Sequence, residues 1–175
     1  MTWRDPPSPL VRILRNDRTD RPGAVQGRRL VVDLDGSAGS VRTARLAAAS
    51  FLTDAEAVPA LAAAFASPRG AYRTALEDVL LVIAELVANA CRHAPGPCRL
   101  TVYPTAETIE VAVHDRGGDR LRLGSDGLRA CYGLIIVARL TRGIRVTAER
   151  DGKVVQAAVP LGVSSPGTVP RPGLR

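Results

Sequence analysis

An apolar run at helical spacing, from about Ala71 to His93, is the feature that most restricts how this chain folds. A carboxylate, Glu85, and a carboxamide, Asn89, interrupt it four residues apart, so both project from the same side of a helix. Burying an unpaired polar group costs about 2–7 kcal/mol on transfer scales. In the first of two interpretations, these side chains form hydrogen bonds with each other or with the backbone. In the second they face a polar ligand, and a metal ion carrying phosphates is one candidate.

The order of the remaining elements indicates an α+β fold. The expected strands cover residues 29–35, 99–103, 108–114, 143–150 and 153–160. The expected helices besides 71–93 begin at Ser40, as N-cap, and at Gly133, and they end near Phe51 and Leu140. The Asp151-Gly152 dipeptide favours a tight hairpin turn between the last two strands. Helices that precede paired strands favour a two-layer α/β sandwich, in which a mixed, mostly antiparallel sheet carries helices on one face.

Composition divides the chain into one domain with two tails. Residues 1–27 and 162–175 are rich in proline and scattered charge, and we expect both to be disordered, the first as a basic tail. The domain is expected over 28–161. Within it, the Ala-rich insertion 53–70 has no functional interpretation, and 116–131 is typical of a mobile surface loop.

The net charge of +7 comes mostly from the ends of the chain. Residues 1–29 carry +4 and residues 30–161 only +1, so the domain lacks an overall basic balance. Aromatic residues make up 3%, which leaves few platforms for stacking bases. Direct binding of nucleic acid is therefore not expected of the domain. Nonspecific electrostatic binding by the amino-terminal tail stays open as an alternative to a solvated extension.

Cysteine spacing and hydropathy bear on the compartment. Cys91, Cys98 and Cys131 are odd in number and lack C-x-x-C spacing, so neither a disulfide framework nor a zinc site is indicated. No apolar segment reaches the roughly 20 residues that span a membrane. We expect a cytoplasmic protein that does not associate with membranes.

Three ordered motifs carry a resemblance to a known family. They are L-V-I-A-E-L-V-A-N-A-C-R-H-A, then V-A-V-H-D-R-G after a strand, and Y-G-L-I-I-V at a helix start. Together with their spacing they resemble the ATP-binding (Bergerat) fold of GHKL-type, or histidine kinase-like, ATPases, and most closely the bacterial anti-sigma-factor serine/threonine kinases. The resemblance covers about residues 29–161.

The resemblance assigns roles to the helical pair. Asn89 would be the metal ligand, holding the Mg²⁺ that bridges the phosphates of ATP, a role that suits a neutral oxygen donor. Glu85 would be the catalytic residue, the general base on the attacking hydroxyl. The alternative is a buried structural pair.

Further positions would bind the nucleotide. Asp115 would accept a hydrogen bond from the amino group of adenine, and Gly117 would let the backbone pass close to the base. The alternative is that Asp115 and Gly117 only form an ordinary turn. The resemblance also places Gly133 and Leu134 at a helix amino terminus that attracts phosphate. His93 is a further candidate for nucleotide contact, with capping of the helix as its alternative.

Two positions depart from the family pattern. Cys131 stands where a glycine is usual, and Val154 stands where a hydroxyl residue commonly helps to bind adenine through water. Both departures concern how well ATP would be bound and used. Neither changes Glu85, Asn89 or Asp115, which keep the residue types of the family pattern.

The resemblance implies a protein serine/threonine kinase that binds ATP and Mg²⁺, sequesters a sigma factor and phosphorylates an antagonist protein. A homodimer is expected, formed through an apolar strip on the first helix or at the sheet edge. The alternative is a degenerate binding module of the same fold that regulates a protein partner without significant kinase activity.

Overall fold

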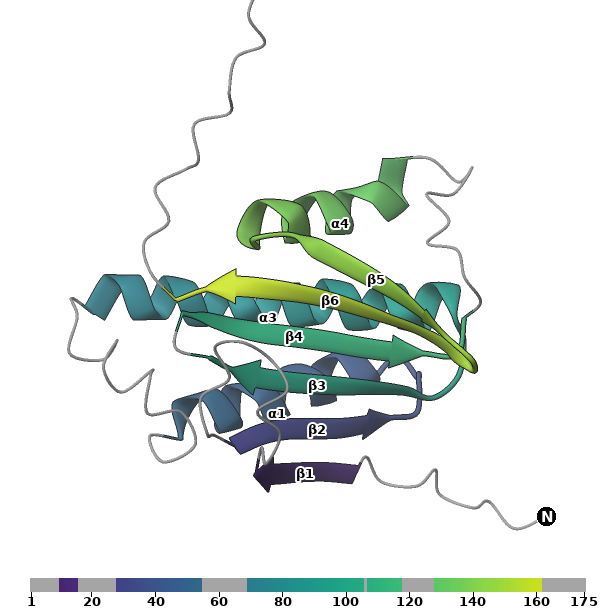
Figure 1. Ribbon diagram of the computed structural model, residues 1–175, viewed down its shortest axis with the longest axis horizontal. Helices are drawn as coiled ribbons and strands as arrows, with labels where there is room; N and C mark the ends of the chain where they lie inside the picture. Colours follow the sequence, from purple (N-terminus) through teal and green to yellow (C-terminus); the bar gives the residue numbers. More distant parts are fainter. Residues whose placement is uncertain (1–9, 16–27, 55–68, 106, 118–127, 162–175) are drawn as a thin grey trace, which may run out of the picture.

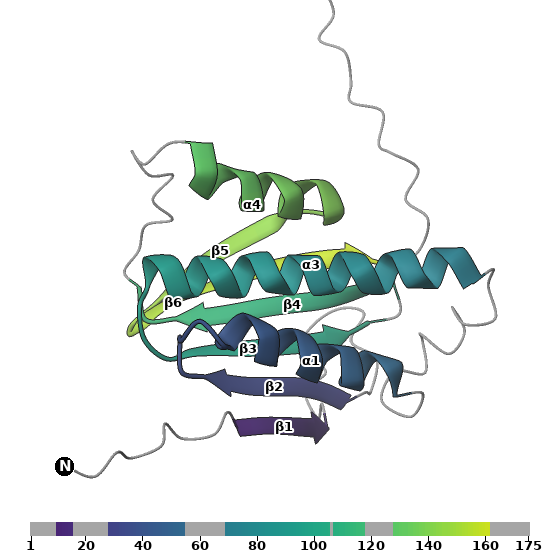
Figure 2. The same ribbon diagram turned by 180° about the vertical axis from the view of Figure 1, so that it is seen from behind.

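The computed structural model describes residues 10–15, 28–54, 69–105, 107–117 and 128–161. Six strands form one sheet in the order β1-β2-β3-β4-β6-β5, and every neighbouring pair is antiparallel. The strands are β1 (Leu10–Arg15), β2 (Arg28–Leu34), β3 (Cys98–Pro104), β4 (Thr108–Asp115), β5 (Ile144–Glu149) and β6 (Gly152–Pro160). The described helices are α1 (Ser40–Thr53), α3 (Arg69–His93) and α4 (Leu128–Leu140). All three lie on one side of the sheet (Figures 1 and 2), which confirms the predicted α+β sandwich.

The core lies between the sheet and these helices. On α1 the buried positions include Ala44, Ala48 and Phe51, spaced at three to four residues as a helix that covers a sheet requires. The face of α3 toward the sheet buries Val79, Val82, Ile83, Leu86, Val87 and Ala90. Full burial of one such Val, Leu or Ile side chain stabilises the fold by about 1.5–3 kcal/mol.

The register of β4 and β6 continues this core toward one end of the sheet. Val111 lies opposite Ala157, and Val113 lies opposite Val155, with all four side chains buried. Side chains alternate between the two faces of a strand, so the next inward pair is two residues further along. That pair is Asp115 and Lys153, at the end of β4 and the start of β6.

Strand β1 corrects the prediction that residues 1–27 do not pack. It pairs in full with β2, and the Arg12 guanidinium lies 2.7 Å from the Asp33 carboxylate. The prolines and charges around this segment hid a strand whose partner is supplied by tertiary structure. The predictions for residues 1–9, 16–27 and 162–175 fall outside the described residues, as do those for most of the 53–70 insertion and for 118–127.

The ends of two helices also differ from the prediction. The N-cap of α1 is Gly39, without a side-chain hydrogen bond, and the Ser40 hydroxyl donates instead to Asp35 Oδ1 at 2.8 Å. Helix α4 begins at Leu128, so Gly133 lies inside it rather than at its amino terminus. The segment from Leu128 to Tyr132 contains no proline or glycine, so nothing in it prevents the helix from starting earlier.

The β5–β6 hairpin turns one residue earlier than predicted. Glu149 pairs with Gly152, which leaves Arg150 and Asp151 as the two turn residues. Gly152 has φ of +151°, a conformation that glycine adopts readily.

Among the described helices, none combines the length and hydropathy needed to cross a bilayer.

Candidate functional site

A buried ion pair lies at the end of the sheet. Lys153 Nζ donates a hydrogen bond of 2.7 Å to Asp115 Oδ1, and the two side chains are 4% and 1% exposed. The pairing follows from the register, which sets these residues directly opposite each other on the helix-covered face. Removing two charges from water is costly, so this pair needs further hydrogen bonds to offset its desolvation.

The two carboxylate oxygens of Asp115 differ in their surroundings. Oδ1 accepts from Lys153 and from the Gly117 amide, the latter at 2.8 Å. Oδ2 is equally buried, and no described residue donates a hydrogen bond to it. An unsatisfied buried acceptor costs about 1–3 kcal/mol, and more when the group is charged. The site therefore presents a charged oxygen that is ready to accept one donor.

Two glycines let the backbone approach this carboxylate. A Cβ at Gly117 would lie 2.7 Å from Lys153 Nζ and 2.8 Å from Ala94 Cβ. A Cβ at Gly152 would collide with the carbonyl oxygen of Asp115. At Gly117 a side chain would occupy the space around the ion pair, so glycine is required there by contact. At Gly152 glycine is required by contact with the backbone of Asp115 and also by conformation, because φ is +151°.

Helix α3 supplies the polar pair of the apolar run. Asn89 is buried, with 8% of its surface exposed, and Glu85 is half-buried one turn earlier. Helix α4 packs closely on this turn, because a Cβ at Gly133 would collide with Glu85 Oε2. Gly133 therefore lies against the carboxylate of Glu85, a contact that the sequence did not predict.

The other predicted positions lie around this arrangement. His93 is the last residue of α3 and is exposed at the carboxyl end of the helix. Leu134 follows Gly133 in α4 and packs against the core cluster. Within the part of the chain that the structure describes, no group of three His, Cys, Asp or Glu side chains could hold a metal ion.

Two thiols lie near the end of α3. Burial raises the pKa of the Cys98 thiol to about 12, and the neighbouring Cys91 adds to the shift. Burial also raises the pKa of Cys91, although hydrogen bonds with Cys98 and Ser40 oppose this. Both cysteines are free thiols, and a raised pKa lowers the fraction of reactive thiolate.

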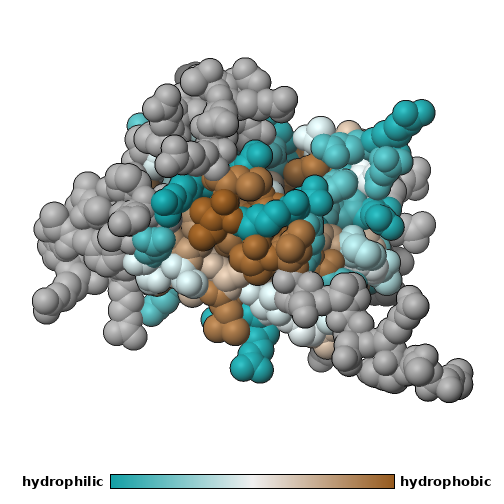
Figure 3. All heavy atoms as spheres, turned by 90° about the horizontal axis from the view of Figure 1, so that it is seen from below, coloured by the Kyte–Doolittle hydropathy of each residue, from teal (hydrophilic) through white to brown (hydrophobic). Residues whose placement is uncertain are grey.

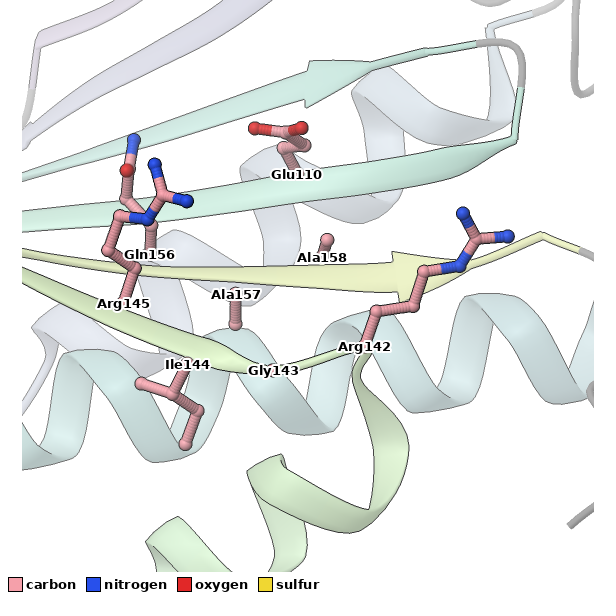
Figure 4. Close-up of a pocket in the computed structure, with 8 residues that line it drawn as sticks. All are labelled: Glu110, Arg142, Gly143, Ile144, Arg145, Gln156, Ala157 and Ala158. Atoms are coloured by element: carbon pink, nitrogen blue, oxygen red, sulfur yellow. The ribbon is translucent and has the colours of Figure 1, made fainter. Parts of the chain in front are cut away.

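A second feature, a hollow of about 440 Å³, lies on β4, β5 and β6. Glu110, Gln156 and Arg145 point from these strands away from the helices (Figure 4). Asp115 and Lys153 belong to the opposite, helix-covered face, so this hollow is separate from the ion pair. The candidate site is at Glu85, Asn89 and Asp115, where the half-buried Glu85 lies one turn from the buried Asn89, and where Asp115 is buried in an ion pair.

Lys153 is the residue that the sequence analysis missed. A signal was present: Val155, Ala157 and Val159 define the inward face of β6, and period two places Lys153 on the same face. A lysine at an inward position needs a buried partner, and Asp115 ends the neighbouring strand on the corresponding face.

Comparison with known proteins gives three findings. The family model described as the histidine kinase-like ATPase domain matches residues 37–159. The crystal structure of the RsbU and RsbW domains of Rv1364c from Mycobacterium tuberculosis has a TM-score of 0.52 and 19% sequence identity to the chain. This similarity, which covers 75% of the present chain and 32% of the other, shows a shared fold. No curated protein matches the sequence significantly.

Proposed function

The chain belongs to the family of histidine kinase-like ATPase domains, and on that premise we propose that it binds ATP with Mg²⁺ among α3, the end of β4 and α4. The observation that carries the proposal is the orphaned oxygen of Asp115, which is buried and lacks a donor among the described residues. The exocyclic amino group of adenine is such a donor. Gly117 keeps side-chain atoms out of the space beside this carboxylate.

The metal fits the donor set of α3. Magnesium prefers hard oxygen ligands and takes few of them from protein when a nucleotide supplies phosphates. Asn89 offers a neutral carboxamide oxygen on the same side of the helix as Glu85. When bound, the metal would neutralise charge on the transferring phosphoryl group.

We propose that Glu85 is the general base. Its carboxylate would accept the proton of the attacking hydroxyl, and a positioned base contributes roughly 10²–10⁴ in rate. Gly133 supports this role because its lack of a side chain leaves room for the carboxylate beside α4. Transfer to a bound hydroxyl otherwise needs mainly positioning and charge neutralisation.

The motifs resemble those of anti-sigma-factor kinases, and this resemblance supports a role for the protein in the control of transcription. We propose that it acts in the cytoplasm, holds a sigma factor, and transfers the γ-phosphate to a serine or threonine of an antagonist protein. The chain spans about a third of the length of the structural neighbour whose fold it shares, so activity and partners are argued from the motifs alone.

The first experiment titrates the protein with a fluorescent ATP analogue, with and without Mg²⁺. Saturable binding that Mg²⁺ strengthens is expected, whereas no binding at millimolar nucleotide would contradict the proposal. Glu85→Gln should retain the nucleotide and lose transfer of labelled γ-phosphate. Nucleotide binding without any transfer by the wild-type protein would favour the binding module without kinase activity. Equal turnover in the variant would exclude Glu85 as the base.

We also propose that two copies pair through β1, which is an edge strand of the sheet formed by the described residues. Its Leu10, Val11 and Ile13 side chains are 53%, 46% and 49% exposed, and apolar groups gather on this side of the molecule (Figure 3). An unpaired edge strand is a template for a further strand, and a two-fold axis would pair it with its own copy. Light scattering should show a dimer that Val11→Lys dissociates, while Leu81→Lys on α3 leaves it intact. A monomeric wild-type protein would contradict this.

A further inference from the structure

The ammonium of Lys153 has unused hydrogen-bonding capacity beside the candidate adenine site. An ammonium has three donors, and among the described residues Nζ makes one hydrogen bond, to Asp115 Oδ1. With 4% of its side chain exposed, Lys153 has little access to water for the other two. A buried charge of this kind is stabilised by each further acceptor that reaches it.

Asp115 and Lys153 together present an acceptor next to a donor. The acceptor is the orphaned Oδ2, and the donors are the remaining N–H groups of Nζ, which is held 2.7 Å from Oδ1 of the same carboxylate. The edge of a 6-aminopurine offers the complement, a donor at N6 next to an acceptor at N1. A 6-oxopurine offers an acceptor at O6 and a donor at N1. In the same position it would place an acceptor opposite Asp115 Oδ2 and a donor opposite Lys153 Nζ.

We propose that Lys153 is a specificity residue of this site, donating a hydrogen bond to N1 of adenine while Asp115 Oδ2 accepts from N6. The proposal rests on the proposed binding of ATP and adds a second polar contact to the base. It gives a function to the buried lysine, which a structural role alone would leave with two unused donors. Val154 pairs with His114 on the opposite face of the sheet, so its lack of a hydroxyl does not bear on this site.

Wild-type protein and altered nucleotides test the proposal without any risk to folding. 1-deaza-ATP carries C–H in place of N1 and keeps the 6-amino group, and 7-deaza-ATP is the matched control because it keeps both. A hydrogen bond from a charged donor corresponds to about tenfold or more in affinity. We expect 1-deaza-ATP to bind about tenfold more weakly than ATP, and 7-deaza-ATP to bind like ATP. ITP should bind more weakly than ATP and 7-deaza-ATP.

The outcomes separate this inference from the proposed function. If ATP does not bind, the proposed function fails. If ATP binds and 1-deaza-ATP binds equally well, the proposed function stands and the contact from Lys153 to N1 is refuted.

Lys153→Met distinguishes recognition from a structural role. If Lys153 contacts N1, the variant loses the difference between ATP and 1-deaza-ATP, and the ratio of their affinities falls to about one. If Lys153 only holds Asp115 in place, both nucleotides weaken equally and the tenfold ratio persists, which would overturn the proposal. Circular dichroism checks the fold, and Lys153→Arg, which keeps donors, should retain part of the discrimination.

Discussion

The contact between Gly133 and Glu85 provides a test of the proposed base. Adding one methyl group at position 133 should displace the Glu85 carboxylate without unfolding the domain. In Gly133→Ala, the new Cβ would collide with Glu85 Oε2 and lie 3.2 Å from Glu85 Cδ. No backbone atom is among these contacts, so the overlap is relieved when the flexible glutamate side chain turns away. The expected consequence is a displaced carboxylate in an otherwise intact domain.

The size of each effect follows from this geometry. Alanine is favoured over glycine inside a helix by about 1 kcal/mol, and this gain offsets the cost of moving one half-buried side chain. The free energy of unfolding should therefore change by no more than about 1 kcal/mol, or about 2–4 °C in Tm for a chain of this size. Loss of a positioned base should lower the rate of phosphoryl transfer by roughly 10²–10⁴.

The assay combines thermal unfolding, nucleotide titration and transfer of labelled γ-phosphate from Mg-ATP to the antagonist protein. Gly133→Ala should retain Tm and nucleotide binding and lose turnover, and Gly133→Ala/Glu85→Gln should be no slower than Glu85→Gln alone. Gly39→Ala is the matched control, because a Cβ there meets only Ser37 Oγ at 3.6 Å. Full turnover in Gly133→Ala, or additive losses in the double variant, would refute the reasoning.

Three further predictions concern the end of the sheet. Gly152→Ala should lower the free energy of unfolding by more than about 1 kcal/mol, measured by urea denaturation, because φ is +151° and the methyl would collide with the carbonyl oxygen of Asp115; an unchanged midpoint would contradict this. Asp115→Ala should cost about 3–5 kcal/mol by leaving the Lys153 ammonium buried and unpaired, and Asp115→Ala/Lys153→Met should regain stability without regaining nucleotide binding. Because burial raises the pKa of Cys98 from 9.0 to about 12, the unfolded chain loses this proton first as pH rises above 9. Stability should then fall by up to about 1.4 kcal/mol per pH unit until pH 12, and Cys98→Ala should reduce that slope.

Alternation and helical spacing were sufficient to predict most of the fold. Val111, Val113 and Asp115 share one face of β4 because side chains alternate, and the same rule applied to β6 would have located Lys153. Strand β1 was missed because the prolines and charges on both sides of it outweighed the short apolar signal of its own residues. It becomes a strand by pairing with β2, whose Asp33 binds Arg12 at 2.7 Å.

The candidate site was predictable only in part, for a related reason. Glu85 and Asn89 could be paired from their spacing within one helix, because that spacing is local. The approach of Gly133 to Glu85 depends on how α4 packs on α3, and no local pattern encodes that distance. A glycine inside an apolar helix was nevertheless a signal of close packing, and it was interpreted instead as a helix start.

The chemistry of the Asp115–Lys153 pair favours recognition over stability as its function. Two apolar residues at these positions would continue the buried Val113–Val155 pair and extend the core without desolvating any charge. Replacing a buried ion pair by apolar residues is often neutral or stabilising, so stability alone does not explain the charges. The orphaned Oδ2 adds a cost in the free protein that a bound donor removes. The proposed binding of ATP would therefore couple nucleotide binding to folding stability at this carboxylate, and ATP should raise Tm in proportion to the logarithm of its concentration above Kd.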